Sequence, residues 1–191
     1  MWLICGLGNP DKKYNHTRHN LGYDVIESLI SLNEFNLIKK DKSKNLYKGK
    51  INTEECLICK PLKYMNLSGP VIAEIIKFYK INIKQIIIIH DDLDLEIGKI
   101  KIKVGGSNAG HNGLSSIDEC IGNNYKRIRF GIGHPGYKDL VSKYVLEKFS
   151  IKERVIVNYR IKILTKYFSL IFKDDGLLLT KIASEGEYNG L

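Results

Sequence analysis

Short apolar runs and amphipathic stretches alternate along this 191-residue chain. The runs at 2–7 and 85–90 are dominated by apolar residues, which is typical of strands buried on both faces of a sheet. After the first run and a polar loop, apolar residues recur on one face of a predicted helix: Leu21, Val25, Leu29 and Leu32. Strands that alternate with helices predict an α/β fold, with a twisted, mixed but largely parallel sheet flanked by helices.

Four more strands are predicted from the same kind of pattern. Two lie near 46–51 and 55–60 and are joined by a short turn. A third, at 99–104, alternates lysine with aliphatic residues, so one of its faces is basic. A fourth lies at 127–132 and carries arginines at alternate positions.

The remaining segments predict helices and a tail. Ser68 can act as the N-cap of one helix, and others are predicted at 113–121 and near 138–146. Ser150 caps a long amphipathic helix with its apolar positions in register: Val157, Ile161, Leu164, Phe168 and Ile171. Because no repeat or linker interrupts the chain, we expect residues 1–191 to form a single domain, with an irregular tail at 174–191.

The formal net charge of +9 favours an anionic partner, either nucleic acid or a membrane surface. A general enrichment in lysine explains the charge equally well, so charge alone leaves both interpretations open. No stretch reaches the roughly 20 apolar residues of a membrane span, and the N-terminus lacks the features of a signal peptide. We therefore expect a cytoplasmic protein with no membrane partner.

Cys56 and Cys59 have the spacing of a C-x-x-C motif but lie inside a predicted strand. Residues three apart in a strand point to opposite faces, so these two thiols can neither share a metal nor form a disulfide. We interpret them as small buried apolar residues.

Polar clusters follow several predicted strands. They occupy 6–20, 60–69, 90–92 and 105–113, and each lies where a strand gives way to a loop or helix. The carboxyl ends of parallel strands meet at one edge of a sheet. The clusters therefore predict a single active site at that edge.

His19 is the best candidate for a general base in these clusters. Histidine titrates near neutrality, and Asp91 at another strand end could fix its tautomer so that the free ring nitrogen accepts a proton. His16 and His19 could form half of a metal site, but no third ligand with suitable spacing is evident, so we expect no metal. Ser68 lacks the G-x-S-x-G context of a nucleophile, and Gly6 and Gly8 lack the third glycine of a dinucleotide fingerprint. The pattern predicts metal-free hydrolysis of an ester or amide by an activated water.

Neutral and cationic side chains complete the candidate site. Asn9, Asn66 and Asn112 can hold a polar backbone or stabilise an oxyanion. Lys101 and Lys103 share one strand face, and so do Arg127 and Arg129, which places cations side by side for phosphates. The alternative to phosphate binding is that these cations only face solvent on exposed strands. This alternative has less weight for the arginines than for the lysines.

At this point the chain resembles the bacterial-type peptidyl-tRNA hydrolases over most of its length. The resemblance rests on five sequence blocks, in order: Gly-Leu-Gly-Asn-Pro-x3-Tyr-x2-Thr-Arg-His-Asn at 6–20, Lys-Pro-x2-Tyr-Met-Asn-Leu-Ser-Gly at 60–69, His-Asp-Asp-Leu-Asp-Leu at 90–95, Gly-Gly-Ser-x2-Gly-His-Asn-Gly at 105–113, and Arg-x-Arg-Phe-Gly-Ile-Gly-His-Pro-Gly at 127–136. The resemblance implies a monomeric enzyme without a cofactor. That enzyme would cleave the ester that joins a peptide to the 3′ ribose of tRNA and so recycle the tRNA.

The same resemblance implies a role for each matching residue. His19 would be catalytic, with Asp91 as its support. The substrate would be held by residues in three groups: the catalytic-site asparagines Asn9, Asn66 and Asn112; the channel residues Tyr14, Asn20, Met65 and His111; and a phosphate clamp of Lys103 and Arg129 with Lys101 and Arg127 beside them.

Two other functions are compatible with parts of this pattern. One is an RNA-binding relative of the same fold that has lost hydrolysis, which could dispense with the His19–Asp91 pair. The other is an esterase for small substrates, which leaves the paired cations unexplained. The chain departs from the expected pattern at Asn108 and Ala109, in a loop that is richer in glycine in the family.

Overall fold

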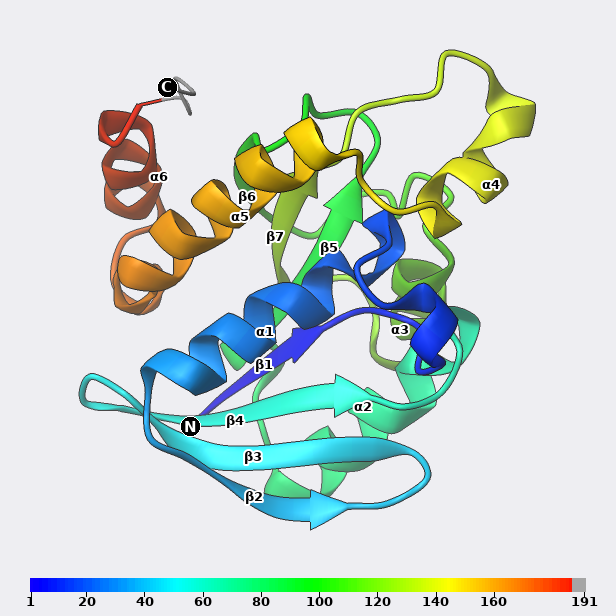
Figure 1. The fold of residues 1–191 in the computed structure, drawn as a ribbon. Helices are drawn as coiled ribbons and strands as arrows, with labels where there is room; N and C mark the ends of the chain where they lie inside the picture. The colour runs from blue at the N-terminus through cyan, green and yellow to red at the C-terminus, as the bar shows by residue number, and fades with distance from the viewer. Residues whose placement is uncertain (187–191) are drawn as a thin grey trace.

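Seven strands form one mixed sheet in the computed structural model, which describes residues 1–186 (Figure 1). The strand order is β2-β3-β4-β1-β5-β7-β6, and β4, β1, β5 and β7 run parallel in the centre. β2, β3 and β6 are antiparallel to their neighbours, which confirms the predicted mixed, largely parallel sheet. The strands are β1 (Trp2–Gly6), β2 (Phe35–Lys40), β3 (Lys44–Ile51), β4 (Glu54–Pro61), β5 (Ile86–Asp92), β6 (Ile100–Val104) and β7 (Lys126–Gly131).

Helices cover both faces of the sheet. They are α1 (Leu21–Leu32), α2 (Ser68–Tyr79), α3 (Asn112–Ile121), α4 (Val141–Leu146), α5 (Ile151–Lys166) and α6 (Asp175–Ser184). Short 3₁₀ helices lie between them at Lys12–Tyr14, Arg18–Asn20, Met65–Leu67, Ile83–Gln85, Lys138–Leu140 and Phe168–Phe172. In residues 1–186, no helix combines the length and the apolar character that crossing a membrane requires.

Two apolar layers hold this arrangement together. Ile87 and Ile89 of β5 pack on the side of α1 and α5, whereas Ile86 and Ile88 pack on the side of α2 and α3. All four side chains are fully buried. Burial of one such side chain stabilises a fold by about 1.5–3 kcal/mol. The continuous apolar run is therefore explained by burial on both faces.

The two cysteines of the C-x-x-C motif confirm the alternation of strand side chains. Cys56 lies in the layer beneath α1 and α5, and Cys59 lies in the layer beneath α2 and α3. Cys59 lies opposite Cys5 in the parallel β1–β4 pair. The thiols of Cys5, Cys56 and Cys59 are all free and buried.

The C-terminal part differs from the predicted irregular tail. Residues 175–184 form α6, with Asp174 as an N-cap that accepts a hydrogen bond from the Leu177 amide. Leu178 and Ile182, four residues apart, are buried against the rest of the protein. The prediction was wrong because this helix is short. A short amphipathic segment becomes a stable helix only when its apolar residues pack against the core. The rest of the predicted tail, 187–191, lies outside the described residues.

Local details also differ from the sequence-based expectations. Ser68 is not an N-cap acceptor, because its hydroxyl donates to the Met65 carbonyl, and Leu67 holds the cap position. Leu32, the last residue of α1, is largely exposed, whereas the other predicted apolar positions of the helix are buried. Ser150 caps the predicted helix, as expected, and the structure adds a capping box with Glu153. The helix ends at Lys166, before a 3₁₀ segment. Strand β2 was not predicted.

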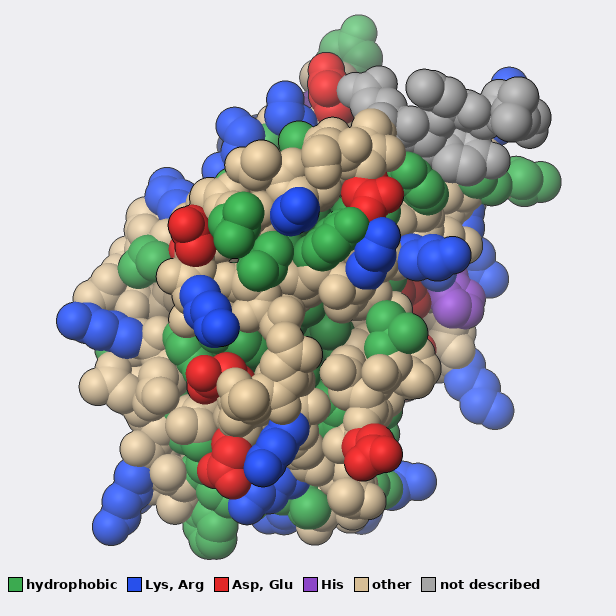
Figure 2. Space-filling view, turned by 90° about the vertical axis from the view of Figure 1, so that its left-hand side faces the viewer, with side chains coloured by type: hydrophobic (Ala, Val, Ile, Leu, Met, Phe, Trp, Pro, Cys, Tyr) green, Lys and Arg blue, Asp and Glu red, His purple; other side chains and the backbone are tan. Residues whose placement is uncertain are grey.

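On the side of the molecule where α6 lies, basic side chains are spread among acidic and apolar ones (Figure 2). Lys166 pairs with Glu185 there, and Lys126 pairs with Asp175. Charge of one sign does not accumulate on this face.

Candidate active site

The predicted polar clusters meet at the carboxyl ends of β1, β4 and β5 and at the start of α3. They surround a cavity of about 830 Å³. The candidate residues that line it are Asn9, Tyr14, His19, Met65, Asn66, Asp91, His111 and Asn112. Segments far apart in the sequence thus supply one site, as expected for the switch region of an α/β sheet.

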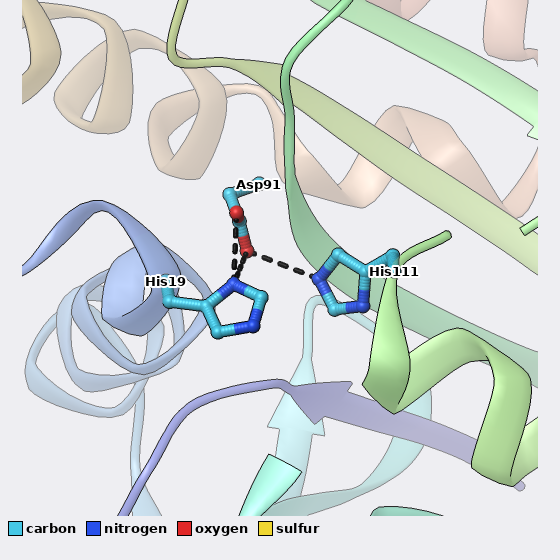
Figure 3. Close-up of side chains that lie close together, drawn as sticks. All are labelled: His19, Asp91 and His111. Carbon is cyan, nitrogen blue, oxygen red and sulfur yellow. Dashed lines mark hydrogen bonds and ion pairs between the residues drawn. The ribbon is translucent and has the colours of Figure 1, made fainter. Parts of the chain in front are cut away.

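His19 and Asp91 form the centre of the site (Figure 3). Nδ1 of His19 lies 2.9 Å from both carboxylate oxygens of Asp91. Asp91 ends the buried strand β5, and His19 follows β1 in a short 3₁₀ helix, so the sheet fixes both partners. The bond orients the imidazole and places Nε2 at its opposite edge, where no hydrogen bond within residues 1–186 occupies it.

Burial and charge act in opposite directions on this pair. Burial alone would lower the pKa of His19, but the charge and the hydrogen bond of Asp91 outweigh it and raise that pKa above its usual value. Burial would raise the pKa of Asp91, whereas His19 and His111 together lower it well below its usual range. Asp91 is therefore ionised and holds a proton on Nδ1 of His19.

His111 is the second partner of Asp91. Its Nε2 lies 3.1 Å from Oδ1 of Asp91, and its Nδ1 accepts hydrogen bonds from the amides of Gly113 and Leu114. Because Nδ1 is an acceptor, the ring proton must lie on Nε2 and is donated to Asp91. A residue that begins α3 thereby completes the hydrogen bonding of the carboxylate.

The same three residues come close enough to be considered as a metal site. Ligand atoms of His19, Asp91 and His111 lie within 4.8 Å of one another. A metal needs the lone pair of a histidine nitrogen, but the Nε2 lone pair of His111 is not free while Nδ1 accepts two backbone amides. The donor set therefore fits a hydrogen-bonded triad better than a cation. His16 takes no part, because it pairs with Asp24 on α1.

Asn9 is held rigidly at the floor of the cavity. Its Oδ1 accepts the Met65 amide at 2.9 Å, so its Nδ2 is left as a donor. Asn20 holds the Asn9 backbone from both sides, with Oδ1 on the amide at 2.8 Å and Nδ2 on the carbonyl at 2.9 Å. Asn20 is 1 % exposed and does not line the cavity. The expectation that Asn20 contacts substrate is thus replaced by a positioning role, since both of its polar atoms are already used.

Asn66 and Asn112 face the cavity from two helix starts. Both are exposed, and neither side chain makes a hydrogen bond within the described part of the chain. Asn112 is the first residue of α3, where the partial positive charge of a helix N-terminus favours a developing negative charge. Amide donors from different elements therefore converge on the space beside His19.

Sequence reasoning missed Arg18 and helix α4 as parts of the site. Arg18 packs over the Tyr144 ring, at 3.9 Å from its centroid, and pairs with Glu153 at 3.1 Å. It thereby ties α4 and α5 to the 3₁₀ helix that carries His19. Val141 and Val145 of α4 form an apolar wall of the cavity. The position of Arg18 beside His19 was a signal for its importance, whereas nothing local in the sequence pointed to α4.

His90 was a further omission. Its ring is buried beside His111, with 5.2 Å between the ring centroids, and its Nδ1 donates to the Asp91 carbonyl. Burial and the neighbouring His111 lower the pKa of His90 to about 3, so this ring is neutral at physiological pH. Its Nε2 has no hydrogen-bond partner among residues 1–186.

The four predicted phosphate-binding cations lie on one face of the β6–β7 pair, and Asp92, the ion-pair partner of Arg129, lines the cavity. Lys101 stands opposite Arg129 and Lys103 opposite Arg127. Lys101 and Lys103 are exposed, and Arg129 is partly exposed with its Nε donating to Asp92 at 2.6 Å.

Arg127 differs from the other three cations. It is 2 % exposed, and its guanidinium binds the carbonyls of Gly106 and Ser107 as well as the carboxylate of Asp118. A buried guanidinium with these partners has no face left for a phosphate. Its expected substrate contact is therefore corrected to a structural one that holds the 105–107 loop on α3.

Together, these elements define an α/β protein whose cavity holds a histidine that is oriented by a buried carboxylate. Comparisons with known proteins specify the class. Residues 3–187 match the family model described as peptidyl-tRNA hydrolase. The chain is 46% identical to a peptidyl-tRNA hydrolase of Rickettsia bellii (strain RML369-C), over 91% of this chain and 95% of that protein. It is 40% identical to that of Bartonella quintana (strain Toulouse), over 99% and 98% of the two chains.

A solved structure agrees with these sequence matches. The crystal structure of peptidyl-tRNA hydrolase from Acinetobacter baumannii matches with a TM-score of 0.89 and 37% identity, over 95% of this chain and 94% of that one. The chain belongs to the peptidyl-tRNA hydrolase family.

Proposed function

We propose that this protein hydrolyses the ester between a peptide and the 3′ ribose of tRNA, with His19 as general base. The observation that carries the proposal is the Asp91–His19 hydrogen bond, which leaves Nε2 of His19 as an acceptor in the cavity. Ser68, the serine considered as a nucleophile, is fully buried and donates to a backbone carbonyl. Direct attack by water is the chemistry that remains.

The reaction proceeds in two proton transfers. Nε2 of His19 takes a proton from water as the oxygen attacks the ester carbonyl, and Asp91 stabilises the imidazolium that forms. The tetrahedral intermediate then breaks its bond to the ribose 3′ oxygen, which takes the proton back from His19. The products are a peptide carboxylic acid and a tRNA with a free 3′ hydroxyl.

Amide groups provide the stabilisation of the oxyanion. The side chains of Asn9 and Asn112 are available donors beside His19, and Asn112 adds the N-terminus of α3. One such donor typically contributes about 10²–10³ in rate. Asn66, which also lines the cavity, is available for the peptide backbone.

The tRNA end is recognised by charge. Lys101, Lys103 and Arg129 form a row beside the cavity, and cations in a row suit successive phosphates. Affinity that depends on such contacts falls steeply with salt, because condensed counterions are released on binding.

The test is release of free tRNA from a model peptidyl-tRNA, measured for the wild type and for His19→Ala with EDTA in both reactions. We expect rapid wild-type turnover that is indifferent to EDTA and is lost in the variant, while tRNA binding persists in both. Tight tRNA binding without wild-type turnover would favour the RNA-binding alternative. Sensitivity to EDTA would refute the metal-free mechanism.

A further inference from the structure

One rim of the cavity carries two tyrosines and a lysine. Tyr14 and Tyr64 both line the cavity. Nζ of Lys13 lies 4.8 Å from the centroid of the Tyr14 ring, and the Tyr64 hydroxyl donates to Asp11 at 2.7 Å. The loops that follow β1 and β4 are thus joined into a continuous edge, with an ammonium group held over an aromatic face.

The order of strands places this rim opposite the phosphate-binding row. Asp91 ends β5, which lies between β1 and β7 in the sheet. Arg129 and the two lysines of β6 lie on the β7 side, whereas the loops that carry Tyr14 and Tyr64 follow β1 and β4 on the other side. If the tRNA phosphates lie on the β7 side, as in the proposed function on which this inference rests, an ester held at His19 directs its peptide toward the tyrosine rim.

The charge of this rim is positive and unbalanced. Lys12, Lys13 and Lys63 are exposed, and within residues 1–186 none of them has an ion-pair partner within 4.0 Å. Asp11 is the nearby acidic residue, and its carboxylate accepts the Tyr64 hydroxyl. The Lys13 ammonium is exposed to solvent, and its contact with the Tyr14 ring, which lines the cavity, positions it beside the cavity mouth.

We propose that Lys13, supported by Tyr14 and Tyr64, is a specificity-determining residue that favours acidic side chains in the peptide close to the ester. The tyrosine rings offer flat surfaces to the peptide chain, and the ammonium attracts carboxylates that emerge beside it. An exposed ion pair changes affinity by about twofold to fivefold, so two acidic residues in place of two basic ones change the preference by about tenfold. Asn9, Asn66 and Asn112 carry neutral amides, so their contacts are indifferent to this charge.

The test compares three substrates on one tRNA: N-acetylated Glu-Glu-Gly, Gln-Gln-Gly and Lys-Lys-Gly, each esterified through the glycine. We measure kcat/KM for the wild type, Lys13→Gln and Lys13→Glu at low and high salt. The wild type should cleave the acidic substrate about tenfold faster than the basic one, with the neutral substrate between them. Lys13→Gln should reduce this ratio, Lys13→Glu should invert it, and salt should reduce it in every case.

Lys84→Glu is the matched control. Lys84 is exposed and precedes β5, at the opposite edge of the sheet, so the change in net charge is the same but distant from the rim. It should weaken cleavage of all three substrates equally and keep their ratio. The inference would be overturned if Lys13→Glu left the acidic-to-basic ratio of kcat/KM unchanged, or if Lys84→Glu changed that ratio by the same factor. Either result would leave the proposed function intact. Failure to cleave any of the three substrates would overturn the proposed function and the inference with it.

Discussion

Nε2 of His111 lies 3.1 Å from Oδ1 of Asp91, while Nδ1 of the same ring caps helix α3. The cap determines which ring nitrogen carries the proton, and that proton binds the carboxylate that orients His19. Secondary structure and catalytic geometry are therefore linked through one imidazole. In this arrangement His111 acts through Asp91, as a positioning residue.

His111→Asn separates the two tasks of this side chain. Asparagine is a good N-cap, so α3 should begin as before and the free energy of unfolding should change by less than about 1 kcal/mol. Its shorter side chain cannot maintain the same contact with Asp91, so kcat should fall by about 10–100-fold, as is usual when such a support is lost. Thermal unfolding and single-turnover rates measure both effects. An unchanged kcat would show that the His111–Asp91 contact is dispensable.

The raised pKa of His19 predicts the acid limb of the pH–rate profile. A general base must be unprotonated, so kcat/KM should fall as the pH drops through the folded-state pKa of His19, which lies above the ordinary value of about 6.5. In Asp91→Asn the carboxylate that raises this pKa is removed. The limb should then move to lower pH and the plateau should drop, which a profile of kcat/KM from pH 5 to 9 would record.

The contribution of His19 to the free energy of unfolding should change with pH in the opposite direction to the rate. A histidine whose pKa is raised in the folded state stabilises the fold at pH values below its unfolded pKa, and this contribution is lost as the pH rises through the folded pKa. The free energy of unfolding of wild type relative to His19→Ala should therefore be largest in mild acid. A difference that grows with pH would contradict the assignment of Asp91 as the dominant neighbour.

Arg127 and Arg129 should respond differently to replacement by alanine. Arg127→Ala leaves Asp118 without its buried partner, and the free energy of unfolding should fall by about 3 kcal/mol. Arg129→Ala should mainly raise KM. It should also make the slope of log K for tRNA binding against log salt shallower, by the amount that corresponds to about one phosphate contact. Denaturant titration and binding measured at several salt concentrations distinguish the two. A KM effect for Arg127→Ala at unchanged stability would restore it to the phosphate-binding group.

The loop before α3 contains a residue in an unfavourable backbone conformation. Ala109 has φ 50° and Gly110 has φ 77°, both in the left-handed region. The left-handed region costs an alanine about 1–2 kcal/mol. Glycine removes this cost but loses more conformational freedom on folding, which offsets about half of the gain. Ala109→Gly should therefore stabilise the protein by about 0.5–1 kcal/mol. Gly110→Ala is the matched control. A Cβ there meets nothing within 4 Å, so its predicted loss of about 1 kcal/mol reflects the backbone alone.

The sequence by itself determined most of the elements and which polar clusters gather at one cavity. Its apolar runs specify buried strands because consecutive apolar residues need cover on both faces. The spacing of Cys56 and Cys59 was enough to separate them onto different layers, since side chains alternate along any strand. Catalytic candidates could be chosen because polar clusters follow strands whose ends must meet.

Only the tertiary structure decided what each polar group is bound to. Lys103 and Arg127 stand opposite each other on adjacent strands, but α3 and the 105–107 loop bury Arg127 and leave Lys103 exposed. Asn20 faces the Asn9 backbone and not the cavity, for reasons of chain path that no local pattern encodes. Helix α6 likewise depends on the apolar surface that receives it. Burial and hydrogen-bond partners arise from contacts between distant segments, and residue order specifies them only through the complete fold.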